Sequence, residues 1–393
     1  MDDRVGNRSW LLAAFAVFAV GWGANQFAPL LYHYRTDQGL AQSEVTAMFS
    51  IYIVGLIPTL LLAGRWSDRN GRRVLMRPVL VLSLAATVLM LFGVQNPFWL
   101  YLGRFLAGLA SGAAFGAGSA WVRELSAGSP PGTGARRAAI ALSGGFGLGG
   151  MVAGLVGEFV PAPLLSAYVP HLVLGTVALV VAWNTADPYQ PVEQSVKTPL
   201  IPASAGTRRF LLGVAPWAWL VFGCASMSFA VLADLLGGDA GGLPTAYAGV
   251  MVGVTLGSGV LIQPVIRRIA ADTPPSRPPI IGLGAASIGM AAGAILAAAT
   301  DLPGRALWLL PVAVMLGIGY GTLLVAGMVQ VELQSGVGDH AGLVAVFYVI
   351  AYLGMGTPYV LAELSRFGGP VPWIAGLAVV CALLIPLARR QLR

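Results

Sequence analysis

The sequence predicts an all-α integral membrane protein with twelve transmembrane helices in two six-helix bundles. Three observations lead to this prediction: the composition, a series of apolar segments of spanning length, and the distribution of basic residues. Of the 393 residues, 57% are apolar and only 10% are charged, whereas about 25% of the residues of a soluble domain are charged. The charged residues are too few to cover a water-facing surface, so lipid is the expected solvent.

The apolar segments divide into two sets of six. A spanning helix needs about 20 mostly apolar residues, and windows of that size fit two groups of segments. The first group is 10–34, 44–63, 74–95, 98–122, 138–160 and 165–183, and the second is 210–234, 244–266, 279–300, 306–331, 341–363 and 371–388.

Residues 184–209 separate the two sets and form the only long polar stretch, rich in Pro, Ser and Thr. We therefore expect an N-terminal six-helix bundle over 1–183, a cytoplasmic linker over 184–209 and a C-terminal bundle over 210–393. Paired glycines in the fifth and eleventh segments, Gly147 with Gly149 and Gly354 with Gly356, suggest that the halves are related. Related halves are common in secondary transporters.

The basic residues predict the orientation in the membrane. With both termini inside, 19 of the 23 Lys and Arg residues fall on the inner side, and only Arg35, Arg104, Arg305 and Arg366 fall on the outer side. Such an excess is the usual bias of cytoplasmic loops. The sequence thus predicts a multi-pass protein of the cell (plasma or inner) membrane with cytoplasmic termini. Because the charge of +7 faces the membrane surface, nucleic acid is not an expected partner.

The strongest motif lies between the second and third segments, where residues 64–73 read GRWSDRNGRR. This run resembles motif A of the major facilitator superfamily of transporters, and it carries every fixed position of that motif: Gly64, Asp68, Arg69, Gly71, Arg72 and Arg73. The resemblance, which includes a general likeness to bacterial efflux permeases, implies two bundles that rock about a central site. It also implies that Asp68 locks the cytoplasmic helix ends in one state, with Arg123 as its partner.

The fourth segment carries a second signal, in which Arg104 is followed by Gly108, Gly112 and Gly116. Residues four apart share a helix face, and the arrangement is similar to motif B of the same superfamily. Arg104 lies roughly 9 Å inside the outer boundary, counting 1.5 Å per residue. An arginine at that depth either snorkels to the headgroups or faces a cavity or partner, where it would hold an anionic group or tune a carboxylate.

Glycines also recur along the fifth segment, from Gly144 to Gly157. This pattern resembles motif C, which is associated with antiporters, but it lacks the Gly-Pro pair of that motif. Close helix packing explains these glycines nearly as well.

Other polar residues at membrane depth are candidates for lining a substrate cavity. With Arg104, they are Asn25, Gln26, Tyr52, Tyr320, Tyr348 and Tyr352. Tyr348, Tyr352, Tyr359 and Glu363 follow four- and seven-residue steps, so one continuous helix would place them on one face. The alternative is that some of them only bond neighbouring helices.

Three carboxylates lie near the outer ends of segments: Glu158, Asp234 and Glu363. Each is either an interfacial carboxylate or a site of proton coupling, and Arg104 is a further candidate for the coupling machinery.

The chain carries no GxxxxGK[ST] phosphate loop and no HExxH, CxxC or nucleophile elbow. We therefore expect a protein that is not an enzyme and that has no cofactor, no metal site and no obligate protein partner.

The favoured function is proton-coupled export of a small organic molecule by alternating access, with the substrate, protons and the lipid bilayer as partners. One alternative is a proton symporter that imports a sugar, nucleoside or organic acid. Another is a membrane sensor or scaffold without transport activity, although the short loops leave no soluble domain for signalling.

Overall fold

The computed structural model describes residues 8–130, 132–188, 201–336 and 338–392. Helices make up these regions, and twelve of them are long and apolar enough to cross a membrane, so the predicted all-α membrane fold is confirmed. Contacts divide the chain into two compact units: Met1–Gly39 with Met48–Ser195, and Leu40–Ala47 with Val196–Arg393. The part of the proposed linker at 189–200 lies outside the described residues, and the linker boundaries stay a prediction.

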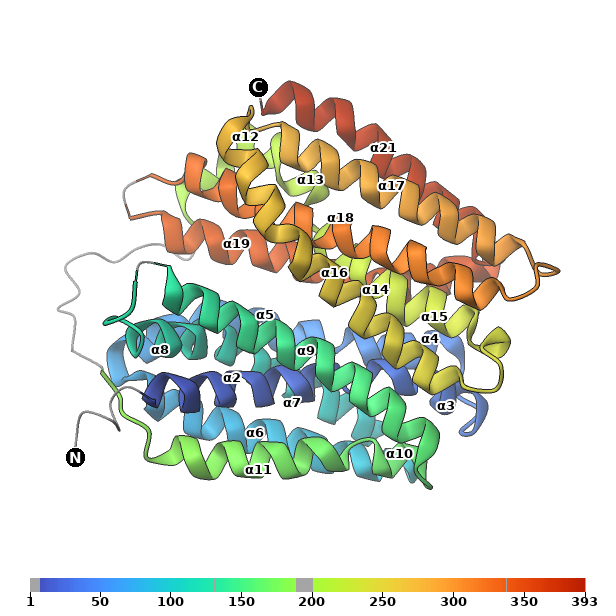
Figure 1. The fold of residues 1–393 in the computed structure, drawn as a ribbon, viewed down its shortest axis with the longest axis horizontal. Coiled ribbons are helices and arrows are strands. Elements are labelled where there is room, and N and C mark those ends of the chain that lie inside the picture. The colour runs from blue at the N-terminus through green and yellow to red at the C-terminus, as the bar shows by residue number, and fades with distance from the viewer. Residues whose placement is uncertain (1–7, 131, 189–200, 337, 393) are drawn as a thin grey trace. The chain divides into compact units, whose positions relative to one another are not determined.

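The first six spans contain α2 to α11 (Figure 1). Their elements are, in chain order, α2 (Ser9–Asn25), η1 (Ala28–Leu30), α3 (Leu31–Thr36), α4 (Gln42–Ser50), α5 (Tyr52–Asn70), α6 (Arg72–Leu91), η2 (Phe92–Val94), α7 (Phe98–Ala113), the π-helical η3 (Ala114–Gly118), α8 (Ser119–Glu124), α9 (Thr133–Phe159), α10 (Pro163–Ser166) and α11 (Val169–Trp183).

The second six spans contain α12 to α21, preceded by η4. Their elements are η4 (Ala203–Gly206), α12 (Arg208–Gly213), α13 (Ala215–Ala218), α14 (Leu220–Ser226), the π-helical η5 (Met227–Leu232), α15 (Ala233–Leu235), η6 (Gly237–Asp239), α16 (Pro244–Asp272), α17 (Arg277–Ala298), α18 (Arg305–Gln334), α19 (His340–Leu353), η7 (Gly354–Gly356), α20 (Thr357–Leu364), η8 (Ser365–Phe367) and α21 (Val371–Gln391).

Several helices are longer than the apolar segments that predicted them. The helices α9, α16 and α18 have 27, 29 and 30 residues. At about 1.5 Å per residue, each exceeds the roughly 30 Å of hydrocarbon in a bilayer. The second span likewise continues beyond residue 63 to Asn70, so the first part of the GRWSDRNGRR run is helical and only Gly71 interrupts the helix. A hydropathy criterion misses such charged helix ends because they extend past the apolar layer.

Apolar side chains on the outer faces of the helices suit contact with lipid. Leu261 on α16 is 78% exposed, and Val180 on α11 and Leu383 on α21 are each 67% exposed. The interior of the first unit instead consists largely of small residues packed around Trp121 and Met76. In a bilayer the attraction between helices comes from close packing, because lipid tails are as apolar as the side chains.

Close packing at glycine recurs in both units. In the first unit α7 packs on α5, and a methyl group on Gly108 or Gly112 would collide with the carbonyl oxygen of Tyr52 or Leu56 respectively. In the second unit α18 packs on α16, where Gly317 and Gly321 stand in the same way against Thr255 and Gly259. Each pair has the spacing Gly-x-x-x-Gly on corresponding spans, four and ten.

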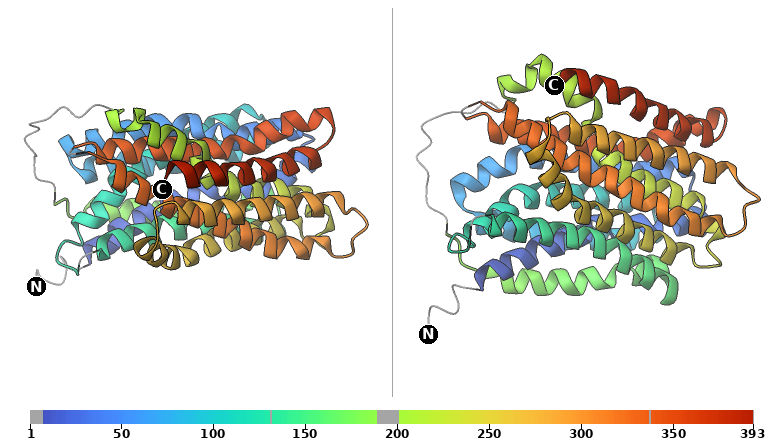
Figure 2. Two further views of the ribbon diagram at one scale, coloured as in Figure 1. Left: turned by 90° about the horizontal axis from the view of Figure 1, so that it is seen from above. Right: turned by 45° about the horizontal axis from the view of Figure 1, so that its top comes forward.

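The first and fifth spans show the same packing, as do the seventh and eleventh. On α9, Gly145 and Gly149 stand against the backbone of Phe18 and Trp22 of α2. In the second unit, Gly354 stands against the carbonyl oxygen of Trp219 in the seventh span. Figure 2 shows both sets of helices in two further orientations. The glycines that resemble motif C therefore have a packing role.

The α5–α7 contact yields a prediction about stability. Gly108→Ala would place a methyl group against the Tyr52 carbonyl, whereas the nearest atom to a methyl group on Gly116 is the Gly64 Cα at 3.9 Å. Overpacking costs about 1–3 kcal/mol or more, so Gly108→Ala should lower the melting temperature of the purified protein by several degrees. Gly116→Ala, the matched control, should leave it unchanged. Equal melting temperatures for the two variants would contradict the backbone contact.

Candidate functional site

A charged cluster joins the ends of the second, third and fourth spans. Gly71 ends α5 with φ +99° and ψ 155°, a backbone conformation that favours glycine. The next residue, Arg72, begins α6 and donates hydrogen bonds to Asp68 and, at 2.6 Å, to Ser67 of α5. Its guanidinium also pairs with Glu124 at the end of α8, with Nη2 2.8 Å from Oε1. One arginine thus holds three helix ends together.

The described residues give Asp68 a different partner from the one suggested by the sequence. Asp68 pairs with Arg72 of its own motif, and α8 meets this cluster through Glu124, the neighbour of Arg123. Successive residues on a helix point about 100° apart, so two neighbours do not face the same target. Arg123 lies where the start of α9 approaches α8, with its Cα 2.9 Å from a methyl group built on Gly134.

The remaining residues of the GRWSDRNGRR run have separate surroundings. Gly64 lies opposite Gly116 of η3, and the exposed Arg69 lies at the end of α5. Arg73 receives two contacts from the segment after the sixth span: its backbone N–H donates to Asp187 at 2.9 Å and its guanidinium donates to the Thr185 carbonyl at 3.3 Å.

The end of the sixth span and the segment that follows it make further contacts with α6 and α8. The Arg77 guanidinium lies 4.6 Å from the centre of the Trp183 ring and donates to the Trp183 carbonyl. Trp121 of α8 donates its indole N–H to the Ala186 carbonyl at 2.8 Å. The beginning of the connection between the two sets of spans is therefore attached to the helices that carry the charged cluster.

Arg104 is completely buried in the first unit, beside aromatic rings. Its guanidinium donates to the Ala24 carbonyl at 2.7 Å and to the Phe49 carbonyl at 3.2 Å. The rings of Tyr52, Phe27 and Phe49 lie 4.7, 5.1 and 5.7 Å from its Cζ. Each is within the roughly 6 Å of a cation–π contact. Because the side chain is buried, it does not snorkel to the headgroups.

A polar cluster holds α2, α6 and α11 together at membrane depth. His171 contacts Thr87 at 2.7 Å through Nδ1 and Ser83 at 3.4 Å through Nε2, and Gln26 donates to Thr87 at 2.9 Å. Gly23 gives the imidazole its space, since a methyl group there would lie 2.5 Å from Nε2. The cluster consists of hydrogen-bonding groups from three helices, which is a common means of helix association in lipid.

Asn25 belongs to a different contact from its neighbour Gln26. Its side-chain amide donates to the Phe146 carbonyl of α9 at 3.0 Å. Asn25 and Gln26 therefore join the first span to the fifth span on one side and to the third and sixth on the other.

In the second unit, aromatic residues gather where α14, α18 and α19 pack. Phe222 stacks on Tyr352 with ring centres 4.2 Å apart and lies 5.7 Å from Tyr320. Tyr348 lies 6.3 Å from Tyr352. Tyr320 and Tyr352 thus contact Phe222, and Tyr348 joins the group through Tyr352. Phe222 was not among the residues selected from the sequence.

The eleventh span is not the continuous helix on which its predicted shared face depends, because the 3₁₀ turn η7 interrupts it between Tyr352 and Tyr359. Tyr352 is 3% exposed, whereas Tyr359 is 40% exposed and Glu363 forms an ion pair with Arg366 at 2.8 Å. The residues before and after the turn therefore differ in exposure. A 3₁₀ turn has 3.0 residues per turn instead of 3.6 and rotates the following helix.

The three candidate carboxylates differ in burial. Asp234 is buried within the short helix α15, which directly follows the π-helical η5. Glu158 near the end of α9 is half-buried, and Glu363 is held in its surface ion pair. Among the described residues, no group of three or more His, Cys, Asp or Glu is arranged to hold a metal ion.

Sequence reasoning missed His171, Ser83, Thr87, Glu124 and Phe222. His171 carried a usable signal, because an ionisable residue within a transmembrane segment is rare and generally faces a partner. Serine, threonine and phenylalanine are too common in apolar helices to be selected without knowledge of their neighbours.

Comparison with known proteins identifies relatives at the levels of sequence and fold. The sequence model of the Major Facilitator Superfamily matches residues 11–357. The multidrug resistance protein MdtL of Klebsiella pneumoniae is 29% identical over 119 residues, a segment that spans 29% of this chain and 29% of that relative.

Solved structures match along nearly the whole chain. A structure of the nucleoside transporter NupG has a TM-score of 0.78 at 13% identity, covering 99% of this chain and 100% of that one. A D-xylose-proton symporter has a TM-score of 0.70 at 15% identity, covering 96% of each chain. At such identities the structures show a common fold.

The contacts of Arg104 lead to a second prediction. In Arg104→Lys, an ammonium group replaces the planar guanidinium. The guanidinium contacts two backbone carbonyls and three aromatic rings, and an ammonium cannot reproduce this planar arrangement of donors. Hydrogen bonds from a charged group contribute about 1.5–3 kcal/mol, so the variant should melt several degrees lower than the wild type. The control is Arg366→Lys, because the Arg366 side chain is 60% exposed and its contacts, with Glu363 and the Ser43 hydroxyl, lie at the surface. An unchanged melting temperature for Arg104→Lys would show that its charge alone is needed.

Proposed function

The chain belongs to the Major Facilitator Superfamily, and we propose that it exports a small organic molecule in exchange for protons by alternating access. The observation that carries the proposal is the cluster of Asp68, Arg72 and Glu124, because it joins helix ends through charges that can separate again. The similarity to MdtL supports export, since that relative is described as a multidrug resistance protein.

The position of the charged cluster suits a reversible gate. Asp68 and Glu124 are 49% and 37% exposed at their side chains, whereas Arg72 is 13% exposed. Partly exposed ion pairs contribute little net stability, typically about 0–1 kcal/mol each. Breaking this cluster is therefore inexpensive, and its loss shifts the balance between two conformations instead of unfolding the protein.

We propose that the aromatic cluster of Phe222, Tyr320, Tyr348 and Tyr352 forms part of the substrate surface. Ligand sites are mostly apolar and aromatic, with a few polar groups that orient the ligand. Tyrosine supplies both an apolar ring and a hydroxyl group. This combination favours a substrate with a ring or another flat apolar portion.

We propose Asp234 as the group that carries the coupled proton. It is the most buried of the three candidate carboxylates, with 6% exposure, whereas the Glu363 side chain is 33% exposed. An acidic residue at membrane depth generally serves a transport or proton pathway. Arg104 is assigned to the support of the first unit, where it holds α2 and α4 against α7.

Both termini are proposed to be cytoplasmic, on the basis of the excess of Lys and Arg in the loops on that side. The two native cysteines, Cys224 and Cys381, are buried, so they give little background in a labelling experiment. A membrane-impermeant maleimide should label Asp3→Cys in everted vesicles and not in intact cells. Labelling of this cysteine in intact cells would show that the N-terminus lies outside the cell and that the orientation is the reverse of the one proposed.

Transport in vesicles tests the function and its direction. Everted membrane vesicles that contain the protein should accumulate a fluorescent aromatic substrate when their interior is acidified, and an uncoupler should release it. Accumulation only in right-side-out vesicles, driven by an inward proton gradient, would indicate the alternative of a proton symporter that imports its substrate.

The gate proposal predicts the effect of removing one charge at a time. Asp68→Asn and Glu124→Gln should each lower the transport rate at least tenfold, while the amount of folded protein in the membrane stays at the wild-type level. Asp272→Asn is the matched control, since Asp272 is an exposed carboxylate at the end of α16 and lies outside the cluster. Wild-type rates in both cluster variants would remove the gate from the mechanism.

The proton proposal predicts a separation of coupled transport from exchange. Asp234→Asn should abolish accumulation driven by a proton gradient, while exchange of labelled for unlabelled substrate at equal pH continues. Glu363→Gln should keep both activities, because that carboxylate forms a surface ion pair. If Asp234→Asn still accumulates substrate against a gradient, another group carries the proton.

A further inference from the structure

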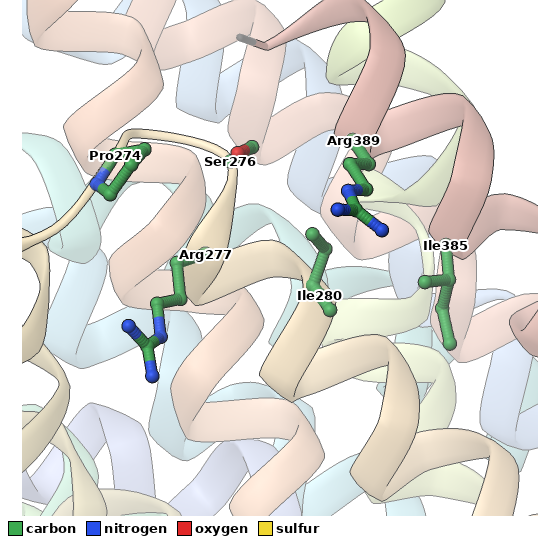
Figure 3. A pocket seen from close by; sticks show the side chains of 6 residues that line it. All are labelled: Pro274, Ser276, Arg277, Ile280, Ile385 and Arg389. Atoms are coloured by element: carbon green, nitrogen blue, oxygen red, sulfur yellow. The ribbon is translucent and has the colours of Figure 1, made fainter.

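A hollow of about 360 Å³ lies between the start of α17 and the end of α21. Its lining residues are Pro274, Ser276, Arg277, Ile280, Ile385 and Arg389 (Figure 3). Two of the six are arginines and none is a carboxylate, while Ile280 and Ile385 supply an apolar floor. The site thus combines positive charge with apolar surface at the ends of two membrane helices.

The two guanidinium groups are available to a ligand. Arg277 and Arg389 are both exposed, and neither forms an ion pair with another described residue. Figure 3 shows the two side chains coming from different helices on either side of Ile280. The Arg277 guanidinium points away from Arg389 in this view, so a ligand at this hollow would meet the two cations at different points of its headgroup.

The walls of the hollow are held in place independently of any ligand. Ser287 of α17 donates to the Ala378 carbonyl of α21 at 2.9 Å. The loop before α17 is fixed by Gln330, whose amide donates to the Pro275 carbonyl at 2.8 Å, and by the Arg277 N–H, which donates to the Pro274 carbonyl at 2.9 Å. The hollow is therefore a feature of the packed helices.

Backbone amides contribute little to anion binding here. The first turn of α17 contains Pro278 and Pro279, which have no N–H, and the N–H groups of Arg277 and Ile280 already donate to Pro274 and Ser276. Anion affinity at this end of α17 must come from the guanidinium groups, with Ser276 as a neutral neighbour. Arginine suits phosphate because its planar fork forms paired hydrogen bonds.

The two helices that form the hollow also expose apolar side chains farther along their spans. On α17, Ile288 is 60% exposed and Ile295 is 67% exposed. On α21, Val379 is 57% exposed and Leu383 is 67% exposed. A ligand with an acyl chain can thus place its anionic group at the arginines and its chain on these faces. A soluble anion gains nothing from the apolar surface.

We propose that the hollow binds an anionic phospholipid, with Arg277 and Arg389 at its headgroup and Ile280 and Ile385 against the first part of its acyl chains. Basic pockets between transmembrane helices are a known means of recognising anionic headgroups. This site lies wholly in the second unit and is separate from the substrate surface and the charged cluster. It would make the stability of the unit depend on the lipid composition of the membrane.

Binding of defined lipids to the delipidated protein in detergent tests this proposal. The probes are phosphatidylglycerol and phosphatidylcholine with identical acyl chains, and native mass spectrometry counts the bound lipids at each concentration. The variant Arg277→Gln/Arg389→Gln should bind the first phosphatidylglycerol about thirtyfold more weakly than the wild type, given roughly 1 kcal/mol for each arginine. Phosphatidylcholine should bind weakly to both proteins.

A matched control removes two arginines elsewhere. Arg267 and Arg268 are exposed near the end of α16 and do not line the hollow, so Arg267→Gln/Arg268→Gln should retain wild-type affinity for phosphatidylglycerol. If phosphatidylglycerol bound equally weakly to both double variants, the loss of affinity would follow from the lower net positive charge alone, and the proposed site would be wrong. Inorganic phosphate that competes with the lipid at millimolar concentration would overturn the lipid assignment. Because binding is measured without transport, the result is independent of the proposed export activity.

Discussion

Close contact between helix backbones is the constraint on which the rest of this structure depends. In lipid, side chains gain little from leaving the solvent, so helices associate through packing and hydrogen bonds. The contacts of Gly108 and Gly112 with α5, and of Gly317 and Gly321 with α16, bring carbonyl oxygens of one helix against Cα atoms of the next. No larger residue permits this approach without moving the helices apart.

The polar sites use space that this packing defines. Arg104 lies one turn before Gly108 on α7, and its guanidinium reaches carbonyls of α2 and α4 because the helices are already close. His171 likewise fits against α2 at Gly23. The membrane-embedded polar groups therefore depend on glycine positions that carry no chemistry of their own.

Charges at the helix ends follow a different principle. Arg72 pairs with both Asp68 and Glu124 at the helix ends, Arg77 holds the end of the sixth span, and Arg73 holds the segment that follows it. Partly exposed pairs of this kind are weak and can exchange partners. The rigid glycine contacts within each unit and the weak charged contacts at its ends thus suit a protein whose parts move as packed bodies.

The sequence by itself determined the twelve spans, the family resemblance and the presence of the motif at residues 64–73. These features depend on local composition and spacing, because a helix in lipid satisfies its own backbone. Only the tertiary structure decided that Glu124 joins Arg72, that His171 meets Gln26 and Thr87, and that Tyr352 is buried while Tyr359 is exposed. Such contacts join residues from separate helices or depend on a break within one helix. Their geometry is set by helix rotation and packing, which an apolar sequence of nearly uniform hydropathy does not encode locally.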